Sequence, residues 1–245
     1  MERIWSSIKT EQERRIPLVV VACEREGMGL VQRLGLQRDV HFRFPGCERE
    51  EHAGFYRSAH FHLAITGVLE HNMSAATTLA LLRLERQISC VVNFGTVGCY
   101  FERADSGCPT VGDVVVIRRV YRFDVDDNVH WARPIELHVP NVNLPAVSCV
   151  TGSRYSTASD RQSIYFPQEG QVEDMELYGL AVLLQTLRIP LLSVKYVVNT
   201  VEPSGREQAR QNIVPFRPRA EVALQRVLRQ AVSQKNLFRR TLTHR

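Results

Sequence analysis

The sequence of 245 residues has no long apolar run, no paired cysteine motif and no internal repeat. Its first apolar run, Ile16 to Cys23, is too short for a membrane-spanning helix or a signal-peptide core, and the stretch before it is polar and charged. We therefore expect a cytoplasmic protein with no membrane partner. Without a C-x-x-C pair, neither a zinc site nor a disulfide framework is indicated, and we expect no metal and no cofactor. The six cysteines are scattered: Cys23, Cys47, Cys90, Cys99, Cys108 and Cys149.

A strong excess of charge of one sign is also missing. The chain has 31 lysines and arginines against 26 aspartates and glutamates, a formal net charge of +5. This mild excess can help to hold an anionic substrate but is weaker than the footprint of a typical nucleic-acid-binding protein. The segment Arg217 to Arg245 is predicted to be a basic amphipathic helix packed at the C-terminus, without aromatic interleaving, so we expect no nucleic-acid partner.

The apolar content is sufficient for one sizeable core, because 44% of the residues are hydrophobic in a chain of ordinary domain length. We predict a polar N-terminal extension over residues 1–15. Residues 16–245 are predicted to form a single domain.

The most informative stretch runs from Val172 to Glu202. An acidic cluster opens a segment with apolar residues at helical spacing, and Pro190 closes that helix because it lacks an N–H. Leu191 to Val198 is then an almost unbroken apolar run, typical of a strand buried on both faces. Ligands of open α/β sheets bind beyond the carboxyl ends of the strands, so Asn199 stands where a site is expected.

Three motifs carry a family resemblance: Asp174-Met175-Glu176 before the helix, Ile189-Pro190 before a strand ending in Asn199, and Val111-Gly112-Asp113 before another strand. Together they resemble the purine nucleoside phosphorylase and nucleosidase superfamily, and most closely the methylthioadenosine/S-adenosylhomocysteine nucleosidases and the futalosine hydrolases. The resemblance implies a three-layer α/β/α sandwich with a central mixed, partly barrel-like sheet. It also implies that the protein forms a homodimer and that it binds a small-molecule purine nucleoside.

The first strand ends at Glu24-Arg25-Glu26. On sequence alone, these carboxylates are a solvated helix start, which the helix dipole favours. The resemblance implies that Glu26 activates the attacking water, and Glu24 stays open as the alternative.

The resemblance also implies the contacts to the sugar. Glu176 would accept hydrogen bonds from the ribose 2′- and 3′-hydroxyls and stabilise the developing cation, and Met175 would form an apolar wall. After the strand Ser89 to Gly95, Gly95 would let the backbone approach the sugar and base, and the Thr96 hydroxyl would position water or ribose.

Tyr155 lies where the family stacks an aromatic ring on the purine, although an exposed loop tyrosine is an equal interpretation without the resemblance. Arg154 is placed to meet a carboxylate or phosphate of the substrate. Another turn leads into a helix from Met73 to Glu85 with Asn72 as its N-cap. This turn carries Leu69 and Glu70 where the family usually has glycine and lysine, which favours water over phosphate as nucleophile. The Pro- and Asn-rich stretch from Asn128 to Pro145 is predicted to be a loop that could cover the 5′ side.

Position 199 departs from the adenine-specific nucleosidases, which have aspartate there. An amide cannot transfer a proton, and loss of a general acid costs about 10²–10⁴-fold in rate. Asn199 can instead donate to a purine O6 and accept from a protonated N7, a pattern that suits a 6-oxopurine. We predict a hydrolase of the N-glycosidic bond of a 5′-modified purine ribonucleoside, which either takes a 6-oxopurine base or is an adenine enzyme slowed by the change at residue 199. The alternatives are a phosphate-dependent purine nucleoside phosphorylase and a catalytically degenerate nucleoside-binding member.

Overall fold

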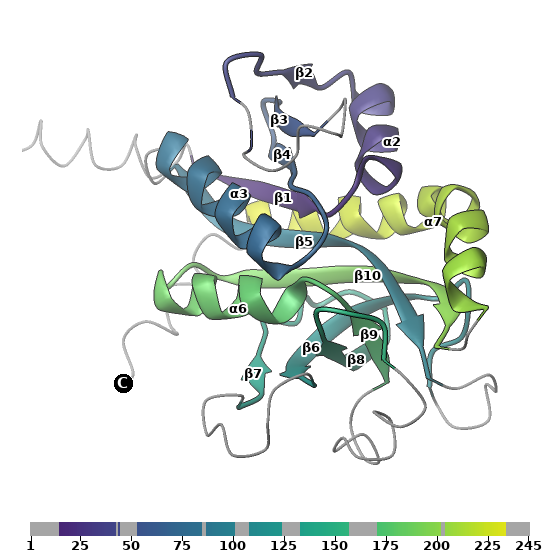
Figure 1. Ribbon diagram of the computed structural model, residues 1–245. Helices are drawn as coiled ribbons and strands as arrows, with labels where there is room; N and C mark the ends of the chain where they lie inside the picture. Colours follow the sequence, from purple (N-terminus) through teal and green to yellow (C-terminus); the bar gives the residue numbers. More distant parts are fainter. Residues whose placement is uncertain are drawn as a thin grey trace, which may run out of the picture.

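The computed structural model describes residues 15–42, 44, 53–84, 87–100, 108–123, 133–156, 171–201 and 204–233 (Figure 1). The proposed extension therefore lies almost wholly outside the described residues, and the domain boundaries stay a prediction. The elements are β1 (Ile16–Val21), α2 (Glu24–Leu34), β2 (Gln37–Arg38), β3 (Gly54–Arg57), β4 (His62–Ile65), α3 (Glu70–Arg83), β5 (Ile88–Cys99), β6 (Val114–Arg122), β7 (Ile135–Glu136), β8 (Ala146–Thr151), β9 (Val172–Asp174), α6 (Leu177–Thr186), β10 (Leu191–Thr200) and α7 (Gly205–Ser233).

The strands form one mixed sheet that closes on itself in part. Its order is β10-β6-β8-β9-β5-β1-β4-β3-β2, and β10 also pairs with β5, so that β10, β6, β8, β9 and β5 make a closed ring. Parallel pairs join β1 to β4 and β5, β5 to β10 and β6 to β8, whereas β10–β6 and β5–β9 are antiparallel. The predicted mixed, partly barrel-like sheet is confirmed.

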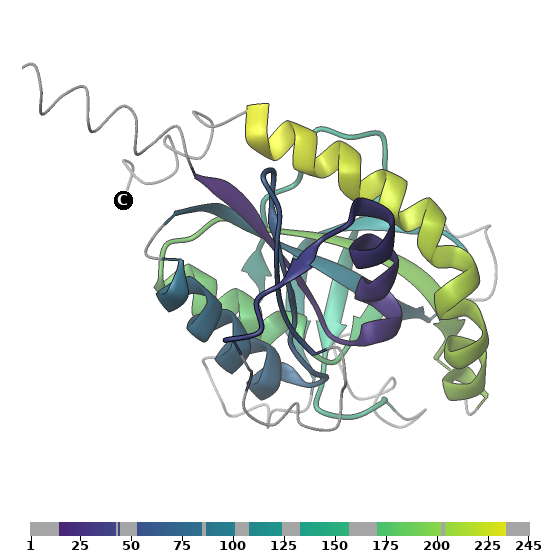
Figure 2. The same ribbon diagram turned by 90° about the horizontal axis from the view of Figure 1, so that it is seen from above.

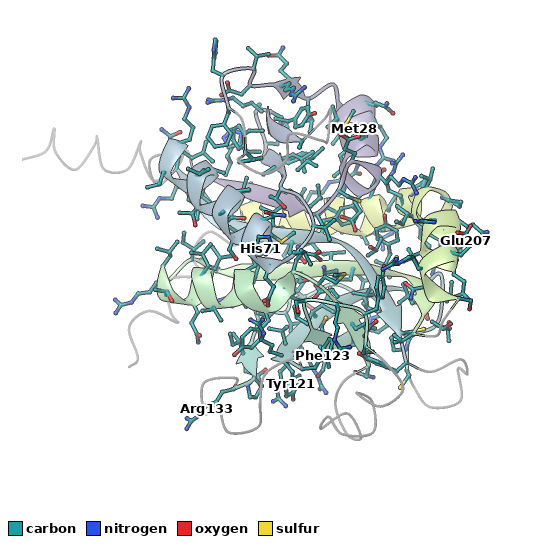
Figure 3. The ribbon with its side chains drawn as sticks, viewed as in Figure 1. Met28, His71, Tyr121, Phe123, Arg133 and Glu207 are labelled. Carbon is teal, nitrogen blue, oxygen red and sulfur yellow. The ribbon has the colours of Figure 1, made fainter. Side chains whose placement is uncertain are left out.

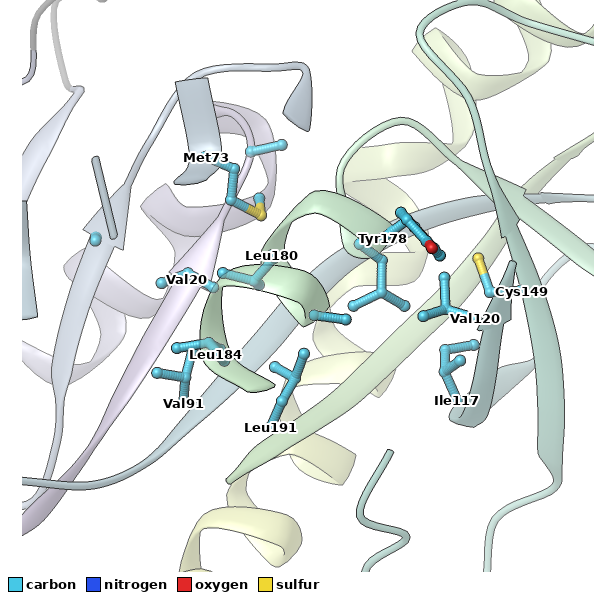
Figure 4. Close-up of a cluster of buried hydrophobic side chains, with 14 of the residues drawn as sticks. Val20, Met73, Val91, Ile117, Val120, Cys149, Tyr178, Leu180, Leu184 and Leu191 are labelled. Atoms are coloured by element: carbon cyan, nitrogen blue, oxygen red, sulfur yellow. The ribbon is translucent and has the colours of Figure 1, made fainter. Parts of the chain in front are cut away.

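Helices cover both faces of this sheet, and each face has its own apolar cluster (Figure 2). On one face, α3 contributes Met73 and α6 contributes Leu180 and Leu184, which pack on Val20 of β1 and Val91 of β5 (Figure 4). On the other face, α2 and α7 pack on the same strands through a second cluster. The predicted three-layer α/β/α arrangement is therefore confirmed.

The strand–helix unit at the centre of the sequence argument folds largely as expected. Helix α6 ends at Thr186, shortly before Pro190, and every residue of β10 from Leu191 to Asn199 is buried. The acidic cluster departs from the prediction that it opens the helix, because residues Val172–Asp174 form the short strand β9. Strand pairing to both β5 and β8 outweighs the weak strand preference of acidic side chains.

Helix boundaries differ from the prediction at α3 and α7. Helix α3 begins at Glu70, so Asn72 lies inside its first turn and does not cap it. Helix α7 begins at Gly205, well before Arg217, and contains Pro215 and Pro218. These prolines concealed its first half, because proline normally ends a helix. Among the described residues, no helix combines the length and apolar character needed to cross a bilayer.

Candidate active site

Glu26 lies in the first turn of α2, directly after β1, and its side chain is buried. Its Oε2 accepts hydrogen bonds from the backbone N–H groups of Ala22 and Cys23, at 3.1 and 3.2 Å. Its Oε1 accepts from the backbone N–H and the hydroxyl of Thr96 on β5, both at 2.8 Å. These contacts fix one carboxylate across two neighbouring strands. They belong to Glu26, so the geometry favours Glu26 over Glu24 as the carboxylate of the site.

Gly95 permits this approach. A Cβ added at Gly95 would lie 3.0 Å from Oε1 of Glu26, closer than ordinary van der Waals contact. The absence of a side chain at residue 95 therefore lets the carboxylate reach the Thr96 peptide. Gly95 thus serves the geometry of Glu26, whereas its expected approach to sugar and base stays a prediction.

Glu176, at the N-terminus of α6, is the second buried carboxylate. Its Oε1 accepts from the Leu69 N–H at 3.0 Å and its Oε2 from the Met175 N–H at 3.3 Å. Burial raises the pKa of the Glu176 carboxyl to about 7, and the charge of Asp174 adds to the rise while Lys195 opposes it. Glu26 also raises this pKa, which puts both carboxylates in one electrostatic environment.

A buried ion pair between Lys195 and Asp174 influences the pKa of Glu176, and this pair was not predicted from the sequence. The Lys195 ammonium lies 2.8 Å from Oδ2 of Asp174, and the side chains are 2% and 1% exposed. Burial opposes the charge of Lys195, but Asp174 and Glu176 outweigh it and raise the pKa of the ammonium. Oδ1 of Asp174 accepts from the Thr151 hydroxyl at 2.6 Å. The available signal was a lysine inside an otherwise apolar strand, because such a lysine needs a buried partner.

Asn199 lies at the carboxyl end of β10 and is buried. Its Nδ2 donates to the Thr200 carbonyl at 2.8 Å. Asn199 pairs with Gly98 of β5, and a Cβ added at Gly98 would lie 2.9 Å from Nδ2, so the amide lies over the glycine. Glu26 and Asn199 therefore contact β5 within four residues of each other, Glu26 at Gly95 and Thr96 and Asn199 at Gly98.

Tyr155 and Arg154 lie at the edge of this region. The Tyr155 side chain is 41% exposed, and the guanidinium of Arg206, at the start of α7, lies 5.3 Å from its ring centre. Arg154 donates to the Tyr155 carbonyl at 3.1 Å and lies 5.6 Å from the ring centre of Phe123. Their roles toward a substrate stay predictions, as does the apolar wall assigned to half-buried Met175.

The turn before α3 is strained at Leu69. Its φ of +84° lies in the region that favours glycine, so Leu69 is an L residue in a strained backbone conformation. The next residue, Glu70, accepts from the Gly179 N–H at 2.9 Å and pairs with Arg122, also at 2.9 Å. The strained peptide thus directs its N–H at Glu176, while Glu70 ties the helix start to α6 and β6.

A pocket of about 390 Å³ adjoins Leu69 on the side of α3, where Figure 3 shows His71. It is lined by Leu69, Glu70, His71, Ser74, Arg122 and Ser153. Leu69 lines the pocket and its N–H donates a hydrogen bond to Glu176, so a single residue connects the pocket to the second carboxylate. Among the described side chains, no group of three or more His, Cys, Asp or Glu is placed to hold a metal ion. Residues 128–132 of the expected 5′ loop lie outside the described residues, and the rest of that loop contains β7.

Comparisons with known proteins identify the fold. No family model and no curated protein matches the sequence. The Arabidopsis thaliana 5′-methylthioadenosine nucleosidase in apo form has a TM-score of 0.75 at 18% identity, covering 89% of this chain and 96% of that one. A methylthioadenosine/S-adenosylhomocysteine nucleosidase has a TM-score of 0.75 at 20% identity, covering 90% and 96%. An aspartate-to-asparagine variant of the Helicobacter pylori nucleosidase, with 5′-methylthioadenosine in its active site, has a TM-score of 0.73 at 11% identity, covering 87% and 98%. The chain has the nucleosidase fold that its sequence resemblance implied.

Proposed function

We propose that this protein is a purine nucleosidase, which hydrolyses the N-glycosidic bond of a 5′-modified ribonucleoside with a 6-oxopurine base. The observation that carries the proposal is that Glu26 and Asn199 contact β5 within four residues of each other, and that the charge of Glu26 contributes to the raised pKa of Glu176. Cleaving this bond requires a base for water, a group that holds the ribose and a partner for the departing purine. These residues supply one group for each task.

In the proposed reaction, Glu26 takes a proton from water held beside the Thr96 hydroxyl. The water oxygen bonds C1′ of the ribose as the bond from C1′ to the purine nitrogen breaks. Glu176, in its ionised form, accepts from the 2′- and 3′-hydroxyls, and its negative charge stabilises the oxocarbenium-like transition state. The purine leaves with a proton at N7 that comes from solvent.

Asn199 would contact the purine through its amide. One of its two N–H groups donates to the Thr200 carbonyl. The other N–H can donate to O6, and the amide oxygen can accept from N7–H. A 6-oxopurine offers this acceptor and donor together, whereas adenine places an amino group at position 6. Tyr155 would stack on the ring, with Arg206 on the tyrosine.

The pocket beside Leu69 is proposed to hold the 5′ substituent. It lies next to the peptide that bonds Glu176, and Glu176 would hold the ribose. Arg122 and the two serines of its lining provide polar contacts, so a polar substituent fits better than a plain methylthio group. Arg154 stays a candidate for a charged group on the same substituent.

Water is the proposed nucleophile. A nucleophilic phosphate carries its own charge and needs no base, whereas a water needs a carboxylate such as the buried Glu26. Glu70, in the first turn of α3, pairs with Arg122 and so occupies a cation that could otherwise bind a phosphate at this helix end. This pairing supports hydrolysis over the phosphorylase alternative.

The direct test is incubation of the purified protein with inosine, futalosine and methylthioadenosine, with and without phosphate, followed by chromatography of the free base. We expect hypoxanthine from the 6-oxopurine nucleosides without phosphate, and little adenine. Asn199→Asp should raise release of adenine, because aspartic acid can protonate N7. Strict dependence on phosphate would establish the phosphorylase instead.

A second candidate function is nucleoside binding without turnover, and Asn199 is the observation that favours it, because an amide cannot act as a general acid. The Helicobacter pylori asparagine variant with 5′-methylthioadenosine in its active site is a parallel in another protein. Calorimetry would reveal a tight complex, and recovery of the intact nucleoside from it would support this candidate. The homodimer implied by the resemblance is a further proposal, tested by sedimentation, and the cytoplasmic location stays a prediction.

A further inference from the structure

Glu173 is a buried carboxylate that the reaction proposed above does not use. It is the middle residue of β9 and is 5% exposed. Its Oε2 accepts from the Tyr100 hydroxyl at 2.9 Å and from the Ser156 hydroxyl at 2.6 Å. Burial and the Glu173 charge both raise the pKa of the Tyr100 phenol, so Tyr100 stays protonated and donates. Two hydroxyl donors thus orient the Glu173 carboxyl group.

The register of the sheet places Glu173 beside Asn199. Gly98 of β5 pairs with Glu173 of β9 on one side and with Asn199 of β10 on the other. Directly paired residues project from the same face of a sheet, and two strand spacings separate the outer Cα atoms by at most about 10 Å. The carboxylate and the amide therefore flank one glycine, which adds no side chain between them.

The loop after β8 links Glu173 to the expected base-stacking residue. Ser156, which donates to Glu173, directly follows Tyr155. Tyr155 in turn lies under Arg206, next to Gly205, and a Cβ at Gly205 would approach Nδ2 of Asn199 to 2.9 Å. Contacts thus connect Glu173, Tyr155 and Asn199 at one end of the site.

We propose that Glu173 recognises the N1 edge of the purine, and so determines base specificity together with Asn199. The inference rests on the proposed function. In the proposed recognition Glu173 is ionised, and an ionised carboxylate only accepts hydrogen bonds, about four of them. N1–H of a 6-oxopurine can donate a hydrogen bond to Glu173. N1 of adenine is itself an acceptor, so its lone pair would be repelled by the carboxylate. A fused two-ring base, with Asn199 at its O6 and N7 edge and Glu173 at N1, spans the distance between the two strands.

The test uses three nucleosides with the same 5′ group: inosine, 1-methylinosine and adenosine. Methylation replaces the N1 hydrogen and leaves the N7 and O6 edge intact. For the wild-type protein, we expect kcat/KM to fall about 10- to 100-fold from inosine to 1-methylinosine, the effect of losing a hydrogen bond to a charged group. Glu173→Ala should lower kcat/KM for inosine by a similar factor, remove the penalty for 1-methylation and leave adenosine unchanged or improved.

Glu136→Gln on β7 is the matched control, because it removes an exposed carboxylate on another part of the sheet and should change none of the ratios. Glu173→Gln, with thermal unfolding measured in parallel, covers the case in which the alanine variant does not fold. Equal values for inosine and 1-methylinosine in the wild type would overturn the inference, as would equal losses for inosine and adenosine in both Glu173 variants.

Binding of hypoxanthine, 1-methylhypoxanthine and adenine by calorimetry separates this inference from the proposed activity. If the protein releases no base but binds hypoxanthine at least about tenfold more tightly than the other two, and Glu173→Gln abolishes that preference, the hydrolase is wrong and the role of Glu173 stands. Equal affinities for the three bases would overturn the role of Glu173 whatever the turnover.

Discussion

The starts of α2 and α6 each carry a buried carboxylate, but the surroundings of the two differ. Glu26 accepts hydrogen bonds on both oxygens, including a side-chain hydroxyl, from β5 and from the end of β1. Glu176 accepts from backbone N–H groups and lies near Asp174 and Lys195, and its pKa is raised to about 7. The comparison indicates that one carboxylate is fixed by hydrogen bonds and the other is balanced by neighbouring charges. This division suits a base with a constant position and a sugar-binding group with a protonation state that depends on pH.

Replacing the base should have the largest effect. Glu26→Gln keeps the shape of the side chain and removes its basicity, so we expect kcat for a nucleoside to fall about 10²–10⁴-fold. Glu176→Gln should raise KM as well, because it weakens the proposed ribose contact. Steady-state kinetics of both variants would contradict the separate roles of Glu26 and Glu176 if both variants changed kcat and KM in the same way.

Removing the buried cation should test how Glu176 is balanced. Lys195→Met leaves Asp174 charged and buried without its ion-pair partner, which typically costs about 3–5 kcal/mol in the free energy of unfolding. It should also raise the pKa of Glu176 further, because Lys195 opposes that rise. Denaturant unfolding measures the first effect, and Lys195→Arg, which keeps the charge, is the control. A loss below about 1 kcal/mol for Lys195→Met would contradict the assigned ion pair.

The pH dependence of kcat/KM should report Glu176 in the free protein. Its pKa of about 7 lies above the ordinary value, so the carboxyl is ionised above pH 7 and protonated below it. We expect kcat/KM to be level above about pH 7 and to fall about tenfold per unit below it. The acidic limb should move to higher pH in Lys195→Met, if enough folded protein remains. A profile that is flat down to pH 5 would show that the charge on Glu176 is not needed.

The smallest effect is expected at the strained turn that supports Glu176. Leu69→Gly keeps the N–H that bonds Glu176 and relieves a positive φ, which costs an L residue about 1–2 kcal/mol. The extra freedom of glycine in the unfolded chain offsets about half of this, so we expect a gain of up to about 1 kcal/mol. Leu82→Gly, at an exposed helical position in α3, should instead lose about 1 kcal/mol. Thermal and denaturant unfolding would measure both, and destabilisation by Leu69→Gly would show that its side chain matters more than its backbone.

The layers of the fold follow from local patterns in the sequence. The apolar run of β10, the helical spacing of α6 and the Pro190 boundary are each visible within a few residues. The closure of the sheet is not, because the second pairing of β10 with β5 joins segments about a hundred residues apart. Family resemblance supplied that closure.

The site was predicted in part for the same reason. Glu24 and Glu26 are equivalent in the sequence, and only the contact of Glu26 with Thr96 on β5 distinguishes them. The ion pair of Lys195 was missed because Asp174 lies on another strand, and the hydrogen bonds of Glu173 were missed because Tyr100 and Ser156 lie in the segments after β5 and β8. Local patterns therefore identify which residue types are present, while the contacts that assign their tasks depend on strand register.

Strand β5 has a consequence for how such a protein can change its substrate. Thr96 contacts Glu26 and Gly98 borders Asn199, so these two contacts are separated by a two-residue step, about 7 Å along a single strand. Loop movements cannot alter that distance. Under the proposed function, a new substrate would be accommodated by exchanging side chains at either end, as asparagine at residue 199 illustrates, or by reshaping the pocket beside α3.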